Sequence, residues 1–116
     1  GATELDNVNK SGINYVSYCF HDVAGYQKFG SYTGSGTGTN QLINTGFQPD
    51  WVWNKRRDST SDHHINDAVR GSSKLLYTNA TTAEQTNANF LTSFDSDGFT
   101  TGSGYWSSSA NIVAWN

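Results

Sequence analysis

The segment Thr45–Arg57, which reads TGFQPDWVWNKRR, places the strongest constraint on the fold. It contains the only proline, Pro49, which fixes φ and lacks the N–H group that a central strand would donate. Aromatic and β-branched residues follow, and this composition favours a strand. Strand alternation places Trp51 and Trp53 on one face and Val52 on the other. Because two indole rings cover a large apolar area, we predict that this strand is central and that these three residues belong to the core.

The composition favours short strands joined by polar turns. Aromatic residues make up 14% of the 116 residues, twelve residues are glycine and none is methionine, whereas a helical bundle would be rich in Leu, Ala, Glu and Lys. Charged residues make up only 15%, with a net charge of −3, so we expect no nucleic-acid partner. No apolar run is long enough to span a bilayer, and no signal peptide is visible, so we also expect no membrane insertion.

Apolar or alternating runs between polar turns predict the remaining strands. These are residues 13–20, 26–32, 41–45, 63–69, 74–78, 90–94, 98–101 and 110–116. We assign Phe29 and Phe94 to the core with the central strand. Thr81 precedes Glu84 by three residues, the spacing of a capping box, so residues 81–87 are the one helical candidate. The expected fold is an all-β, antiparallel β-sandwich, jelly-roll-like or lectin-like, with at most one short helix.

The two ends of the chain carry similar segments. Residues 11–19 align without a gap with residues 108–116. The matching pairs are Asn14 with Asn111, Val16 with Val113, and Tyr18 with Trp115. One interpretation is a tandem array, in which residues 1–25 include the closing strand of a preceding repeat and residues 26–116 form the sandwich module. The alternative is that two buried strands converged on similar residues.

Five motifs, in order, resemble an uncharacterised repeat family of large structural proteins in tailed bacteriophages, many of them marine. The motifs are YVSYCF at 15–20, GYQKFGSYTG at 25–34, TGFQPDWVW at 45–53, DAVRG at 67–71 and LTSFDSDGFT at 91–100. The resemblance implies a β-sandwich module of a tail fibre or similar virion appendage, and it implies no catalytic residues. The chain departs from the family pattern at Asn54, which is commonly apolar, and at Tyr105 and Trp106, where small polar residues are more usual.

One polar cluster has the composition of a metal site. It contains Asp58, Asp62, His63, His64 and Asp67. Neighbouring histidines on a strand point to opposite faces, so at most one could join the carboxylates, and the cluster has too few ligands for zinc. We therefore expect no metal and no cofactor, with His63 and His64 as ordinary strand residues or as contacts to a partner.

Carboxylates leave one enzymatic alternative open. Asp58, Asp62, Asp67 and Glu84 could meet in space as the acid pair of a glycan-degrading, depolymerase-type hydrolase. Nothing in the sequence positions them to do so, and no Gly-x-Ser-x-Gly motif is present. We therefore expect that the protein is not an enzyme.

Tyr105 and Trp106 lie in a loop rich in glycine and serine. Large aromatic residues in such a loop could bind a sugar ring or a neighbouring subunit, or could fold back onto the core. We expect a non-enzymatic structural and adhesive module of a phage tail fibre or similar fibrous appendage, located in the virion or outside the cell. Its partners would be copies of itself, as a homo-oligomer, or neighbouring fibre modules, together with a host-surface glycan or receptor. In a purely architectural role, the same residues would be buried against neighbouring copies, and residues 13–20 would pair with the edge of the next unit.

Overall fold

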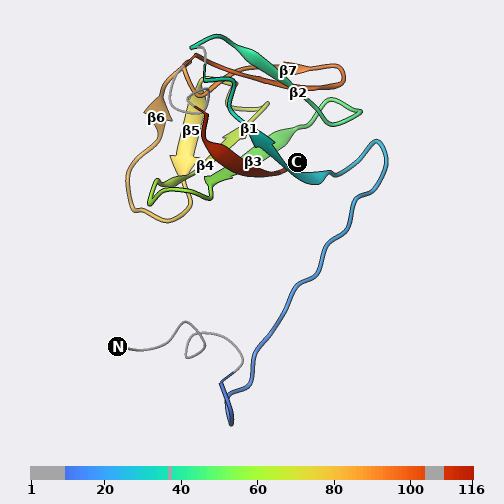
Figure 1. Cartoon of the computed structure of the whole chain (residues 1–116), viewed down its shortest axis with the longest axis vertical. Coiled ribbons are helices and arrows are strands. Elements are labelled where there is room, and N and C mark those ends of the chain that lie inside the picture. Colours follow the sequence, from blue (N-terminus) through green and yellow to red (C-terminus); the bar gives the residue numbers. More distant parts are fainter. Residues whose placement is uncertain (1–9, 37, 104–108) are drawn as a thin grey trace.

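The computed structural model describes residues 10–36, 38–103 and 109–116, and these residues form nine strands and no helix (Figure 1). The strands are β1 (Phe29–Thr33), β2 (Gln41–Asn44), β3 (Trp51–Arg56), β4 (His63–Asp67), β5 (Lys74–Tyr77), β6 (Gln85–Thr86), β7 (Leu91–Asp95), β8 (Gly98–Thr101) and β9 (Asn111–Trp115). The described residues thus contain no helix that could cross a membrane.

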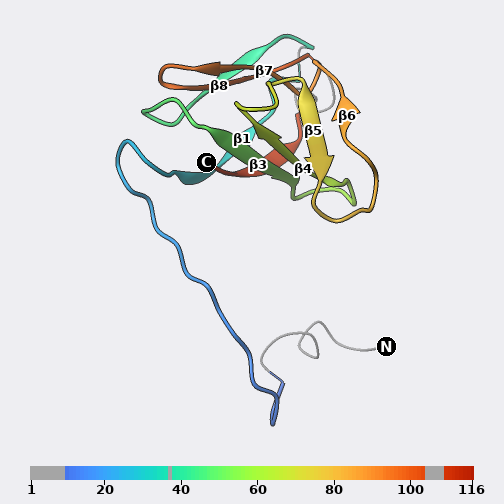
Figure 2. The ribbon, with the colours of Figure 1, turned by 180° about the vertical axis from the view of Figure 1, so that it is seen from behind.

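The strands form two antiparallel sheets. The large sheet has the order β1-β9-β3-β4-β5-β6, and the small sheet has the order β2-β8-β7. Figures 1 and 2 show the small sheet above the large one from opposite sides. The predicted all-β, antiparallel sandwich is confirmed. Strand β9, the last along the chain, lies between β1 and β3.

The core fills the space between the two sheets. Val52, Leu91, Phe99 and Ala114 are buried there, and Phe94 packs against them. The inner face of the large sheet also carries polar side chains, which are partnered as buried amides require. The hydroxyl of Tyr32 donates to Asn54 (3.4 Å), and Asn66 Nδ2 donates to two main-chain carbonyl groups at 2.9 and 2.8 Å.

The predicted core is wrong for two tryptophans and for Phe29. On β3, Val52 and Asn54 point into the sandwich, so Trp51 and Trp53 lie on the outer face of the large sheet. Trp51 is 41% exposed and Trp53 is half-buried. Phe29 is half-buried on the same outer face, opposite Trp115 of β9. The alternation was predicted correctly, but the inner face holds the smaller side chains.

Two predicted elements are also absent. Residues 81–87 form no helix; instead β6 pairs with the first two residues of β5. Residues 13–20 form no strand. They belong to an extended segment, residues 10–28, which we call the arm and which runs away from the sandwich (blue in Figure 1). Its exposed apolar side chains are Ile13, Tyr15, Val16, Tyr18, Phe20, Val23 and Tyr26.

Candidate functional site

An apolar row crosses the outer face of the large sheet. The strand register places Phe29 opposite Trp115, Trp115 opposite Trp53, Trp53 opposite Ile65, and Ile65 opposite Leu76. The row therefore spans five strands on the side that faces away from the small sheet. All five side chains keep some solvent exposure, and Leu76 is 38% exposed. A continuous apolar surface of this kind marks a site of contact with another molecule.

Aromatic packing fixes the centre of this row. The rings of Trp53 and Trp115 stack with centroids 4.8 Å apart and planes inclined by 33°. The indole N–H of Trp53 donates to Thr78 Oγ1 at 3.1 Å. Trp51 lies two residues before Trp53 on the same face, and its indole N–H has no hydrogen-bond partner among the described residues. Trp53 and Trp115 are thus held rigidly, while Trp51 offers an exposed ring.

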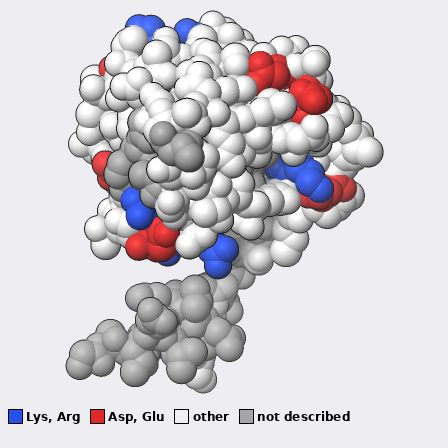
Figure 3. Space-filling view, turned by 45° about the horizontal axis from the view of Figure 1, so that its top comes forward, with Lys and Arg blue, Asp and Glu red and all other residues white. Residues whose placement is uncertain are grey.

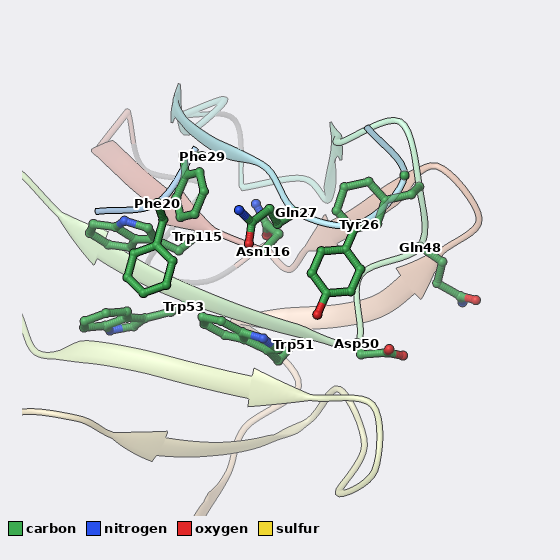
Figure 4. A pocket seen from close by; sticks show the side chains of 12 residues that line it. Phe20, Tyr26, Gln27, Phe29, Gln48, Asp50, Trp51, Trp53, Trp115 and Asn116 are labelled. Carbon is green, nitrogen blue, oxygen red and sulfur yellow. The ribbon is translucent and has the colours of Figure 1, made fainter. Parts of the chain in front are cut away.

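A pocket of about 490 Å³ lies where the end of the arm passes this row. Phe20 and Tyr26 of the arm line it together with Trp51, Trp53 and Trp115 of the sheet. Figure 4 shows the rings of Trp51 and Trp53 side by side along one wall, with Tyr26 at one end. The volume falls within the range of small-ligand sites, which are mostly apolar with a few polar groups.

Polar side chains complete the pocket wall. Gln48 and Asn116 are held by hydrogen bonds from their amide nitrogens to main-chain carbonyl oxygens, at 3.0 and 3.1 Å. Asn116 is 8% exposed, and its Oδ1 atom has no hydrogen-bond partner among the described residues. The carboxylate of Asp50 also lacks one within that part of the chain. The wall therefore combines aromatic rings with the exposed carboxylate of Asp50, whereas the Oδ1 atom of Asn116 is buried.

The two histidines lie on opposite faces of β4. His64 is buried in the sandwich, where its ring packs edge-on against Tyr77 and Phe90 (centroids 5.0 and 4.5 Å apart). Burial lowers the pKa of His64 to about 4. The expected partner contact through His64 is therefore wrong, because its side chain is inside. His63 lies on the outer face, with Nε2 2.7 Å from Lys55 Nζ.

The other two expected contact residues, Tyr105 and Trp106, lie outside the described residues. The sequence interpretation did not find the pocket because it assigned Trp51 and Trp53 to the core. The pocket wall becomes visible once the register of β1, β9 and β3 is known, because this register places Phe29, Trp115 and Trp53 in one row.

Three of the carboxylates considered for catalysis are paired with arginines, and two of these three share one arginine. Asp58 lies 2.5 Å from Arg56, whose hydrogen bond lowers the pKa of that carboxyl group. Partial burial would raise the pKa of Asp67, but hydrogen bonds from Arg70 outweigh it and lower that pKa. Glu84 lies 3.4 Å from the same Arg70. The two lowered pKa values keep Asp58 and Asp67 ionised at neutral pH, which is the wrong state for a general acid.

The remaining charges form no extended patch of one sign on the face shown in Figure 3, where acidic and basic groups are scattered over a largely uncharged surface. Asp62 accepts a hydrogen bond from Asn79 at 3.0 Å. Within residues 10–36, 38–103 and 109–116, no group of three or more His, Cys, Asp or Glu side chains is arranged to hold a metal ion.

The chain belongs to the family described as a domain of unknown function, DUF7483. The family model matches residues 2–52 and residues 35–116, so both the arm and the sandwich carry the family pattern. No curated protein and no solved structure matches the chain.

Proposed function

We propose that this domain is a non-enzymatic adhesive module of a tail fibre or similar fibrous appendage, and that its aromatic pocket binds saccharide rings. The observation that carries the proposal is the partly exposed tryptophan surface on a sheet face that the small sheet leaves uncovered. Aromatic rings contribute large, rigid apolar area at low entropic cost, and Trp51 offers such an area to a flat ligand.

The polar groups of the pocket favour a saccharide over a purely apolar ligand. A sugar ring has apolar C–H faces and a rim of hydroxyl groups, so it needs an aromatic platform beside hydrogen-bond acceptors. Asp50, which precedes Trp51, supplies exposed acceptor oxygens, and Gln48 is a second exposed polar residue of the pocket lining. The pocket matches this pair of requirements.

Such a site would bind weakly on its own, and a fibre would compensate with many copies. Linked sites raise the effective concentration of one another, so avidity can exceed the affinity of a single site by about 10²–10⁴. A homo-oligomeric fibre in the virion or on another extracellular appendage would present the pocket in this way to glycans of a host surface.

The test is a glycan array probed with a multivalent form of the full chain, followed by titration of the strongest glycan. Trp51→Ala should reduce affinity about tenfold, which corresponds to about 1.4 kcal/mol. Val69→Ala is the control, because Val69 is an exposed apolar residue (97%) outside both the apolar row and the pocket. Val69→Ala should leave binding unchanged.

Two results would overturn the proposal. The first is a glycan signal that survives Trp51→Ala, because the platform would then take no part in binding. The second is the absence of any glycan signal together with self-association that Trp51→Ala abolishes. That second result would make the outer face a protein contact and the domain purely architectural.

A further inference from the structure

The arm has the form of a strand that lacks a neighbour. It is extended between residues 13 and 20, and apolar side chains lie on both of its sides. Tyr15, Val16 and Tyr18 are 49%, 80% and 83% exposed. Three large apolar side chains in four residues are costly to leave in water, since each is worth about 1.5–3 kcal/mol when buried. The arm therefore has the character of a buried strand without its sheet.

The aligned segment at the other end of the chain shows what such a strand does. Residues 108–116, which align with residues 11–19, contain β9. In β9, Ile112 and Ala114 are buried in the core, while Val113 and Trp115 face the outer side. In the alignment, Tyr15 and Ser17 take the inner positions of Ile112 and Ala114, and the outer positions keep a valine (Val16) and an aromatic residue (Tyr18).

The backbone supports the same equivalence. Ser109, just before β9, has φ of 56°, and it is the one residue other than glycine with positive φ in the described part of the chain. It aligns with Gly12, whose φ is 78°. A left-handed backbone conformation is uncommon for residues other than glycine. The aligned positions 12 and 109 both have this conformation, so the two segments are similar in backbone structure as well as in sequence.

We infer that residues 12–19 are the ninth strand of a second sandwich unit of this family, in which they lie between β1 and β3 of that unit. The sandwich described above cannot accept them at that position, because its own β9 already pairs with both neighbours. The partner is therefore a sandwich unit of this family that lacks a ninth strand of its own, and a second copy of the described sandwich is excluded because its β9 fills that position. This inference is independent of glycan binding, since Tyr15 and Ser17 lie outside the pocket.

The end of the arm is built to hold the two units in a fixed relation. Val23 and Gln27 form an isolated antiparallel bridge, and Asp22 accepts hydrogen bonds from Lys28 Nζ at 2.5 Å and from the N–H of Phe29 at 2.8 Å. These contacts fix the turn that leads from the arm into β1. Residues 20–28 thus act as the joint between a ninth strand and the first strand of the next unit.

The experiment uses a two-unit chain in which residues 20–107 are placed before residues 11–116, so that the upstream unit has the arm in place of its own residues 108–116. Amide hydrogen exchange of residues 13–18 is compared with that in the natural chain. The expected result is exchange about a hundredfold or more slower in the two-unit chain, because a central strand opens only with its sheet.

Two variants of the two-unit chain test the side-chain directions. Tyr15→Asp should abolish the protection, because it places a charge in the core, whereas the matched control Val16→Asp should leave most of it. Because Tyr15 is larger than Ile112, a Tyr15→Ile form is measured as well, and protection in either form supports the inference.

The inference is overturned if residues 13–18 exchange as fast in both the two-unit chain and its Tyr15→Ile form as in the natural chain. It is also overturned if Val16→Asp removes the protection and Tyr15→Asp does not. Val16 would then point into the core and Tyr15 away from it, which is opposite to the aligned residues of β9. Such a segment would lie on the surface of a sheet and would not complete it.

Discussion

The two faces of the large sheet differ in what their side chains do. Along β3, Val52 and Asn54 are 0% and 2% exposed on the inner face, whereas Trp51, their neighbour on the outer face, is 41% exposed. The largest side chains of the strand thus lie on the side without a covering sheet. Bulk and burial are therefore separated on this strand: the inner face stabilises the fold, and the outer face is available for contact.

The core between the inner face and the small sheet should dominate stability, and Phe99 on β8 of the small sheet gives the clearest test. Phe99 is fully buried between the sheets, with its ring edge-on to that of Tyr32 at 6.1 Å. Phe99→Ala should lower the free energy of unfolding by about 3–5 kcal/mol. Urea denaturation measures this loss. Val69→Ala is the control, because Val69 is 97% exposed and its truncation should change stability by less than about 0.5 kcal/mol. Equal losses in both variants would contradict the assignment of the core.

The buried histidine gives the inner face a pH dependence. Because the pKa of His64 is about 4 in the folded protein and 6.5 in the unfolded chain, the unfolded state binds the extra proton first. Stability should be complete above pH 6.5 and fall by up to about 3 kcal/mol as the pH drops to 4.

His64→Gln should flatten this profile, whereas His63→Gln, on the outer face, should keep it. The measurement is the denaturation midpoint as a function of pH. An unchanged slope between pH 4 and 6.5 in His64→Gln would show that another group causes the loss of stability.

The outer face should contribute less to the free energy of unfolding than the size of its side chains suggests. Trp53 is half-buried and stacked on Trp115, so Trp53→Ala should cost about 1–2 kcal/mol and leave the domain folded. Thermal unfolding measures the loss, and Trp53→Phe should recover part of it by restoring a stacked ring. Complete unfolding of Trp53→Ala would mean that this face is as important to the fold as the inner one.

The strand pattern of the sandwich could be read from the sequence because local signals were strong. Pro49 precedes β3, alternating runs correspond to β2, β4 and β5, and the turn at residues 95–98 joins β7 to β8. The capping-box spacing between Thr81 and Glu84 was misleading, since the segment is short and polar and its last residues pair with β5 instead.

The direction of the faces could not be read in the same way. A period of two shows which residues share a face but not which face is covered, so the choice rested on hydrophobicity. Hydrophobicity favoured the tryptophans over Asn54, His64 and Asn66, yet all three polar side chains are buried. Asn54 is bonded to Tyr32, which lies 22 residues away in the sequence, and Asn66 is bonded to carbonyl groups of a loop and of the next strand. The pocket was missed for the same reason, because it depends on the outer position of those tryptophans.

The position of β9 has a consequence for how the domain acquires its structure. The strand that comes last along the chain joins β1, about 80 residues earlier, to β3, so the large sheet remains in two parts until it arrives. On the ribosome, β1 and β3 would emerge before β9 is synthesised. The backbone groups of β1 and β3 that pair with β9 would remain without partners until then. A nascent chain in that state is open to any sequence that resembles β9, and neighbouring chains made on one message could exchange strands before either is complete.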